Sequence, residues 1–186
     1  MKPKDLISFL NVIEKLKCNT RHSWTSTGRQ ESVAEHSWRL AVTAMLCADE
    51  YPKIDIDKVI KMCLVHDLGE AITGDIPAFW KNESDEQKEE DAVNTILSPL
   101  PDKTKEEFLS LFEEMKKLES DEAKLFKSLD KIETLISHNE ADISTWLPLE
   151  HTENLTYGDE VCNWSEWIKA LKEEVKKDSI SKINGN

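Results

Sequence analysis

The first chemically informative feature of this sequence is a histidine–aspartate doublet, His66–Asp67. His66 falls on the apolar side of a predicted helix, together with Val59, Met62 and Cys63. Polar residues on the core side of a helix are uncommon, and they need a partner. A doublet of this kind is a weak signal on its own, so its meaning depends on what else the fold brings to the same place.

Two further polar residues share this inward placement. His36 lies beside apolar residues on one side of a second predicted helix, and Asp130 falls within the apolar stripe of a third. If the three helices pack together, two imidazoles and two carboxylates converge. Such a donor set suits one divalent cation, such as Mn, Co, Fe, Zn or Mg. For each residue taken alone, the alternative stays open: a hydrogen-bonded core histidine, or an aspartate that caps a helix or forms an ion pair.

Helical spacing of apolar residues recurs along the chain and predicts the elements that must position these side chains. Ser32 and Glu35 form a capping box for one helix, Ser84 and Gln87 suggest another, and a polar loop with Gly28 precedes the first. The predicted helices cover approximately residues 4–17, 32–49, 55–66, 84–98, 101–118, 121–140 and 163–177. No stretch alternates polar and apolar residues over enough positions to predict a strand. We therefore expect an all-α, single-domain bundle of six to eight helices over residues 1–178, with a frayed tail over 179–186.

The charge, the apolar runs and the cysteines of the sequence limit the kinds of partner and the cellular setting that we expect. The chain has 24 Lys and Arg against 37 Asp and Glu, a net charge of −13, which disfavours binding to nucleic acid polymers. No apolar run is long enough to span a membrane, and the N-terminal segment is amphipathic. The four cysteines are far apart, with no C-x-x-C pair, as expected for reduced thiols. These features predict a soluble, cytoplasmic protein.

The order of the four polar residues, H…HD…D, resembles that of the HD-domain metal-dependent phosphohydrolases. The segments ESVAEHSWRLAV, HDLGEAITGDIP and EAKLFKSLDKIETLISHNE are similar to the 5′-deoxynucleotidase branch, which includes the HD-domain-containing protein 2 group. The resemblance runs from about residue 6 to residue 150, and TGDIP is its most specific element. It implies an HD-type helical bundle.

The resemblance also implies roles around one metal ion. Its metal ligands match His36, His66, Asp67 and Asp130, and it assigns Glu70 to the attacking water. Glu70 is four residues after His66 and hence on the same helical face, within reach of such a water. Two-metal members need extra histidines after the doublet, and residues 68–129 contain none. One divalent ion is therefore expected.

Substrate contacts follow from the same resemblance. Arg21 matches the arginine that orients the phosphate, and Asp75 matches a catalytic aspartate near the sugar and phosphate. The substrate is further expected to contact Asp67 and Asp130 and a wall formed by Ile76, Pro77 and Ala78. In some members, an aromatic residue directly follows this arginine, and the aromatic side chain contacts the sugar. Here that position is His22, a departure that bears on the selectivity for deoxyribose.

These observations predict a metal-dependent phosphomonoesterase that hydrolyses (deoxy)nucleoside 5′-monophosphates, and the resemblance suggests a homodimer. One alternative is a nucleoside triphosphate hydrolase of the same superfamily. The small size of the chain, the single arginine near the site and the absence of a Lys/Arg cluster disfavour it. Another is a non-catalytic helical regulatory module with a structural metal, which would not need Glu70, Asp75 or Arg21. His138 and His151 lack a metal-like partner pattern.

Overall fold

A computed structural model describes residues 1–77 and 80–185 and confirms the predicted all-α class. In these ranges the helices longer than one turn are α1 (Pro3–Ile13), α2 (Val33–Leu46), α3 (Ile56–Val65), α5 (Glu83–Leu97), α6 (Asp102–Lys117), α7 (Asp121–Glu140) and α10 (Glu166–Ile183). The shorter elements are α4 (Glu70–Thr73), α8 (Glu150–Glu153), α9 (Asp159–Cys162), the 3₁₀ turns η1 (Glu14–Lys17), η2 (Ala48–Glu50) and η3 (Ile143–Thr145), and strands β1 (Thr20–Trp24) and β2 (Gln30–Ser32).

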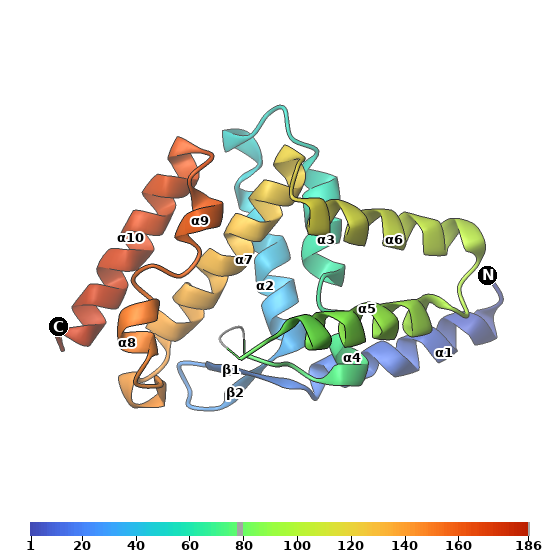
Figure 1. Ribbon diagram of the computed structural model, residues 1–186, viewed down its shortest axis with the longest axis horizontal. Helices are drawn as coiled ribbons and strands as arrows, with labels where there is room; N and C mark the ends of the chain where they lie inside the picture. Colours follow the sequence, from blue (N-terminus) through green and yellow to red (C-terminus); the bar gives the residue numbers. More distant parts are fainter. Residues whose placement is uncertain (78–79, 186) are drawn as a thin grey trace.

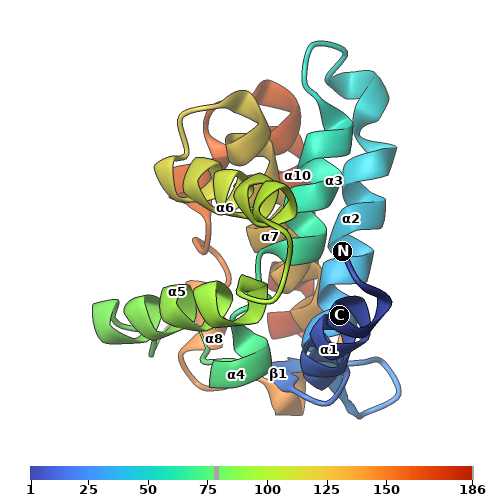
Figure 2. The same cartoon turned by 90° about the vertical axis from the view of Figure 1, so that its right-hand side faces the viewer.

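Helix α7 runs through the middle of the fold, and the other elements are arranged around it. It packs against α2 and α3 on one side and α10 on the other, while α6 covers its N-terminal end (Figure 1). Its apolar stripe, formed by Leu125, Leu129, Ile132 and Leu135, is fully buried. Helices α2 and α3 lie side by side in both views, and α5 extends away from them next to α4 and α1 (Figure 2).

The segment after the first helix differs from the prediction. Instead of a polar loop, residues 20–32 form an antiparallel hairpin in which Thr20 pairs with Ser32 and Trp24 with Gln30. Gly28 adopts a positive φ of 84° in the connecting turn. The strands are short, irregular in register and nearly devoid of apolar residues, so they lack the alternating pattern by which strands are predicted. This hairpin carries Arg21 and His22.

The chain changes direction directly after the histidine–aspartate doublet. Helix α3 ends at Val65 with His66 as its C-cap residue, and the short helix α4 begins at Glu70. A Cβ on Gly69 would lie 2.9 Å from the backbone oxygen of Glu89 in α5, so only glycine allows this close approach. The predicted end of this helix at residue 66 is confirmed to within one residue.

The caps confirm three predicted helix starts and correct one. The Ser32–Glu35 capping box opens α2, Asp55 caps α3 and Ser120 caps α7. The predicted Ser84–Gln87 box is wrong, because Asn82 and Asp85 form the box of α5. Asparagine is as good an N-cap as serine, and the sequence offers both within three residues.

The expected tail from residue 179 is helical. Helix α10 continues to Ile183 because Ser179 is fully buried and donates a hydrogen bond to Asn139 Oδ1 of α7.

Within the described ranges, no helix is both long enough and apolar enough to cross a bilayer.

Candidate active site and metal centre

The four predicted ligand residues converge where α2, the end of α3 and the middle of α7 meet. His36 Nε2 lies 3.3 Å from Asp130 Oδ1, and His66 Nε2 lies 3.8 Å from the same oxygen. His66 Nε2 is also 3.1 Å from Asp67 Oδ2, and one donor atom each of His36, His66 and Asp67 lies within 4.8 Å of the others. The three helices thus bring two imidazoles and two carboxylates together.

This cluster fits a divalent cation. Although His36 is fully buried, its Nε2 has no hydrogen-bond partner among the described residues. Buried polar atoms are nearly always satisfied, so a buried nitrogen that faces other donors of metal-ligand type indicates a ligand site. Two imidazole nitrogens and two carboxylate oxygens form a set that Mn, Co, Fe, Zn or Mg can use.

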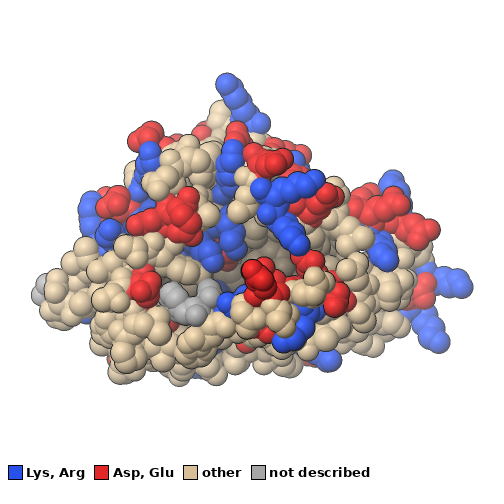
Figure 3. Space-filling view, in the orientation of Figure 1, with Lys and Arg blue, Asp and Glu red and all other residues tan. Residues whose placement is uncertain are grey.

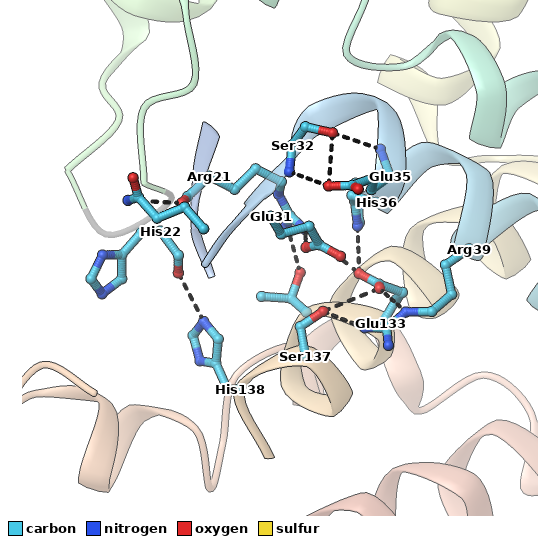
Figure 4. Close-up of polar contacts among 12 residues, drawn as sticks. Arg21, His22, Glu31, Ser32, Glu35, His36, Arg39, Glu133, Ser137 and His138 are labelled. Carbon is cyan, nitrogen blue, oxygen red and sulfur yellow. Dashed lines mark hydrogen bonds and ion pairs between the residues drawn. The ribbon is translucent and has the colours of Figure 1, made fainter. Parts of the chain in front are cut away.

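Glu133 of α7 orients the His36 ring from behind. Its Oε2 makes a short contact with His36 Nδ1, and its Oε1 accepts a hydrogen bond from Arg39 Nε at 2.7 Å (Figure 4). Glu133 is itself 2% exposed. Burial by itself raises the pKa of Glu133, but the His36 contact and the two nearby arginines outweigh it and lower the pKa to about 2. The ring of His36 is thereby fixed with Nε2 toward the cluster.

Burial and Arg21 disfavour a charged His36, but the close carboxylates of Asp130 and Glu133 outweigh them and raise the pKa of His36 to about 9. The carboxylates around His36 therefore attract positive charge to this point of the structure.

A second group of possible ligands, Glu31, His36 and Glu133, lies on the other side of the same ring. Its carboxylates are already neutralised by side chains. Arg21 Nη1 lies 3.0 Å from Glu31 Oε2 and 3.6 Å from Glu133 Oε2, and Arg39 binds Glu133 as described above. With two arginines in place, this group needs no cation.

Glu70 lies beside the cluster at the start of α4. It is 5% exposed, and its Oε2 is buried without a hydrogen-bond partner among the described residues. Burial, followed by the charges of Asp67, Asp75 and Glu89, raises the pKa of Glu70 to about 10. A carboxyl group with a buried, unpartnered oxygen next to a possible metal site can contact a bound water.

Arg21 reaches the cavity from strand β1. Its Nη2 donates to Thr134 Oγ1 at 3.2 Å, and its remaining contacts are the two carboxylates named above. Asp75 lies directly after Gly74 and lines the same cavity. Burial raises the pKa of Asp75, and Arg21 opposes this shift.

The four predicted ligand residues line one cavity of about 390 Å³ together with Arg21, Glu70 and Asp75. His22, Ile76 and Pro77 line it too. This volume suits a ligand of nucleotide size. Ala78, predicted for the same wall, lies outside the described residues. On the face shown in Figure 3, basic and acidic side chains are intermixed around a central hollow.

The cavity also contains residues that sequence reasoning missed. Three lysines line it, Lys81, Lys127 and Lys131, so the expectation that no basic residues gather near the site was wrong. Lys127 and Lys131 lie four residues apart on the face of α7 that carries Asp130, a spacing that could have grouped them, whereas Lys81 lies before α5 and shares no such pattern. His138, set aside earlier, lines the cavity too, with Glu150, Asn154 and Tyr157 from the C-terminal part of the chain.

Comparison with known proteins agrees with this arrangement. The HD domain family matches residues 13–172. The chain belongs to the HD domain family. Among curated HD-domain relatives, the Homo sapiens 5′-deoxynucleotidase HDDC2 is 36% identical over 141 residues, covering 74% of this chain and 68% of that protein. The Schizosaccharomyces pombe 5′-deoxynucleotidase hdd1 is 35% identical over 143 residues, covering 72% and 71%.

Solved structures are similar over nearly the whole chain. A protein from Magnetospirillum magnetotacticum MS-1, described as a predicted metal-dependent phosphohydrolase, superposes with a TM-score of 0.82 at 27% identity. The match covers 96% of this chain and 93% of that one. A conserved hypothetical protein from Pyrococcus furiosus reaches a TM-score of 0.73 at 31% identity, covering 92% and 99%. The similarity includes the C-terminal part that the sequence resemblance did not reach.

Replacing His36, His66 or Asp130 with alanine is expected to remove metal-dependent stabilisation. A cation that binds only the folded state at 100 times its Kd adds about 2.7 kcal/mol to the free energy of unfolding. The wild type should therefore melt at a higher temperature with Mn²⁺ than without it, whereas the variants should show little difference. The measurement is thermal unfolding with and without metal, together with metal analysis after dialysis.

The matched control is His151→Ala, since His151 lies on α8 and does not line the cavity. This variant should respond to metal like the wild type. A His36, His66 or Asp130 variant that keeps the full metal content would remove that residue from the ligand set.

Proposed function

We propose that this HD-domain protein is a divalent-metal-dependent 5′-deoxynucleotidase, which hydrolyses deoxynucleoside 5′-monophosphates to a nucleoside and phosphate. The observation that carries the proposal is the shared cavity. A His₂Asp₂ cluster with an unpartnered imidazole nitrogen, a buried carboxyl group and an arginine all line it. The names of the curated relatives support the same reaction.

In this proposal His36, His66, Asp67 and Asp130 hold one divalent ion, and Asp67 and Asp130 also face the substrate. When bound, such an ion supplies positive charge to a phosphoryl oxygen and makes water more acidic. Glu133 has a positioning role, because it keeps Nε2 of His36 directed into the cluster. Nothing in the donor set selects a single metal.

Glu70 holds the attacking water and accepts its proton in its carboxylate form, which positive charge at the neighbouring ligand cluster would favour over the protonated form. Its unpartnered Oε2 lies in the same cavity as His66 and Asp67, which places an acceptor next to the metal ligands. Water needs such an acceptor because its own proton must leave as the new P–O bond forms.

Arg21 and Asp75 lie on the substrate side. The guanidinium binds the phosphate with charge-assisted hydrogen bonds, and Thr134, Glu31 and Glu133 hold the Arg21 side chain in place. Asp75, which lines the same cavity, contacts the sugar and the ester oxygen. His22, Ile76 and Pro77 complete the described part of the wall around the nucleoside.

A nucleoside triphosphate hydrolase is the second candidate, and one observation favours it. Lys81, Lys127 and Lys131 line the cavity and could bind further phosphates. Two of these lysines already form ion pairs, Lys81 with Glu89 at 2.6 Å and Lys127 with Asp130 at 3.0 Å. We therefore favour the monophosphate.

Phosphate release from nucleoside mono-, di- and triphosphates, measured with each of several divalent metals, separates these candidates. The nucleotidase releases inorganic phosphate from deoxynucleoside monophosphates. A triphosphate hydrolase acts on triphosphates instead, and a module with a purely structural metal releases phosphate from none of them.

Glu70→Ala is expected to lower turnover by roughly 10²- to 10⁴-fold, the usual contribution of a positioned general base. Metal content should stay near that of the wild type, because Glu70 is assigned to the water. The measurement is steady-state kinetics on a deoxynucleoside monophosphate together with metal analysis. Wild-type turnover would rule out the catalytic role, and a metal-free variant would make Glu70 a ligand.

Arg21→Ala is expected to raise KM as well as lower kcat, because the guanidinium contacts the phosphate in both the ground state and the transition state. Arg29→Ala is the matched control, since Arg29 is an exposed arginine of the same hairpin that pairs with Glu35. Equal kinetics for the two variants would contradict the role of Arg21.

We further propose a cytoplasmic homodimer that binds neither membranes nor nucleic acid polymers. Trp38 and Met45 on α2 are 64% and 58% exposed, and Leu64 on α3 is 51% exposed. Large exposed apolar side chains on two adjacent helices are suited to a self-complementary contact. Sedimentation at micromolar concentration should show a dimer, and a monomer alone would contradict this.

A further inference from the structure

A group of buried polar side chains lines the cavity beyond Arg21, and none of the roles proposed above uses its members Glu150 and Asn154. Asn154 is 1% exposed and Glu150 is 2% exposed, and both come from the region around α8. His22 and His138 face them. A buried carboxylate and a buried amide cost stability unless their polar atoms find partners, so their presence in a cavity wall calls for a ligand.

The contacts leave part of this group unpartnered. Asn154 Oδ1 lies 3.3 Å from His138 Nδ1, whereas Asn154 Nδ2 and His22 Nε2 are buried with no hydrogen-bond partner among the described residues. Glu150 Oε2 accepts a hydrogen bond from the backbone N–H of Leu147 at 2.6 Å. Its Oε1 lies 3.4 Å from His22 Nε2 and 3.8 Å from His138 Nε2. The wall therefore offers an amide donor and a carboxylate acceptor to a ligand.

The position of this group along α7 indicates which part of a nucleotide reaches it. His138 comes eight residues after the proposed ligand Asp130, which is about 12 Å along the helix axis. In the proposed function, the phosphate and sugar lie near Asp130 and near Arg21, whose side chain Thr134 holds. Within a nucleotide, a distance of this size from the phosphate extends past the sugar, so the base is the part that reaches His138, Glu150 and Asn154.

From these observations we propose that Glu150 and Asn154 are specificity-determining residues that bind the hydrogen-bonding edge of the nucleobase. Asn154 Nδ2 donates to a ring nitrogen or carbonyl oxygen, and Glu150 Oε1 accepts from a neighbouring N–H. The Watson–Crick edge of each common base carries an acceptor and a donor side by side, so the pair recognises a base in general. The inference rests on the proposed nucleotidase function.

The adjoining cavity between α5 and α6 is the other place for a base. It measures about 580 Å³ and has an apolar lining that includes Val93, Leu109 and Phe112. Arg21 and Asp75, assigned to the phosphate and sugar, line the smaller cavity and not this one. A nucleoside that continues from them lies on the side of Glu150 and Asn154.

Glu150→Gln tests the proposal with little change of shape. The amide oxygen can keep the hydrogen bond from Leu147, while the amide nitrogen replaces the acceptor Oε1 with a donor. The value of kcat/KM for thymidine 5′-monophosphate should fall about tenfold, mostly through KM, as expected for the loss of a paired base contact. On 1,2-dideoxyribose 5-phosphate, which keeps the 3′-hydroxyl but has no base, the variant should equal the wild type.

Two further variants complete the test. Asn154→Ala should show the same selective loss, so the test does not depend on one variant that fails to fold. Glu153→Gln removes the same charge from an exposed position of α8 outside the cavity and should behave like the wild type on both substrates. Equal losses on both substrates in the Glu150 and Asn154 variants, or no loss on either, would overturn the proposal.

Calorimetric binding of thymidine 5′-monophosphate to the metal-free protein separates this proposal from the catalytic one. If the wild type binds the nucleotide more tightly than Glu150→Gln but hydrolyses nothing, the nucleotidase function fails and the base site stands. If hydrolysis is observed and the two proteins bind and turn over the nucleotide equally, the base site fails and the nucleotidase function stands.

Discussion

The buried contact between Glu133 and His36 is the interaction on which the site depends. A carboxylate that is 2% exposed is unfavourable unless positive charge surrounds it, and Glu133 has Arg39 and Arg21 in addition to the imidazole. These partners come from α2 and β1, so one side chain of α7 joins the three elements. The consequence for function is that the Nε2 of His36 has only one direction available, toward Asp130 and His66.

The same centre shows how stability and chemistry compete in this fold. Asp67, Glu70 and Asp130 bring negative charge into a largely buried region, and His36 Nε2, Glu70 Oε2 and Asn154 Nδ2 lack partners among the described residues. Such groups destabilise a folded protein and persist where a ligand satisfies them. Their distribution follows the proposed substrate: metal and water at one end of the cavity, the base at the other, and Arg21 between them.

Local sequence signals predicted most of the helices, and they singled out side chains that the fold brings together. Ser32, Asp55 and Ser120 each start a helix because a side-chain oxygen can accept from a free backbone N–H, a rule that needs no tertiary information. His36, His66 and Asp130 were recognisable because each is a polar residue in an apolar stripe. The hairpin that carries Arg21 had no such pattern, since its strands are short and polar.

The remaining parts of the site depend on contacts between distant segments. Glu133 is charged and lies one turn after Asp130, and only the packing of α2 against α7 shows that it contacts His36 rather than solvent. Glu150 and Asn154 lie in a stretch without a motif, more than eighty residues after the histidine–aspartate doublet. The sequence carried a stronger signal for Glu133 than for Glu150 and Asn154. Glu133 lies three residues after Asp130 and therefore shares its helical face.

The most direct test of the central claim is the position of the metal in crystals grown with Mn²⁺, located by anomalous scattering at the manganese edge. The account predicts one strong peak bonded to Nε2 of His36 and of His66 and to oxygens of Asp67 and Asp130, with Glu133 still on Nδ1 of His36. A peak between Glu31 and Glu133, or fully occupied manganese that leaves His36 Nε2 without a bond, would contradict it.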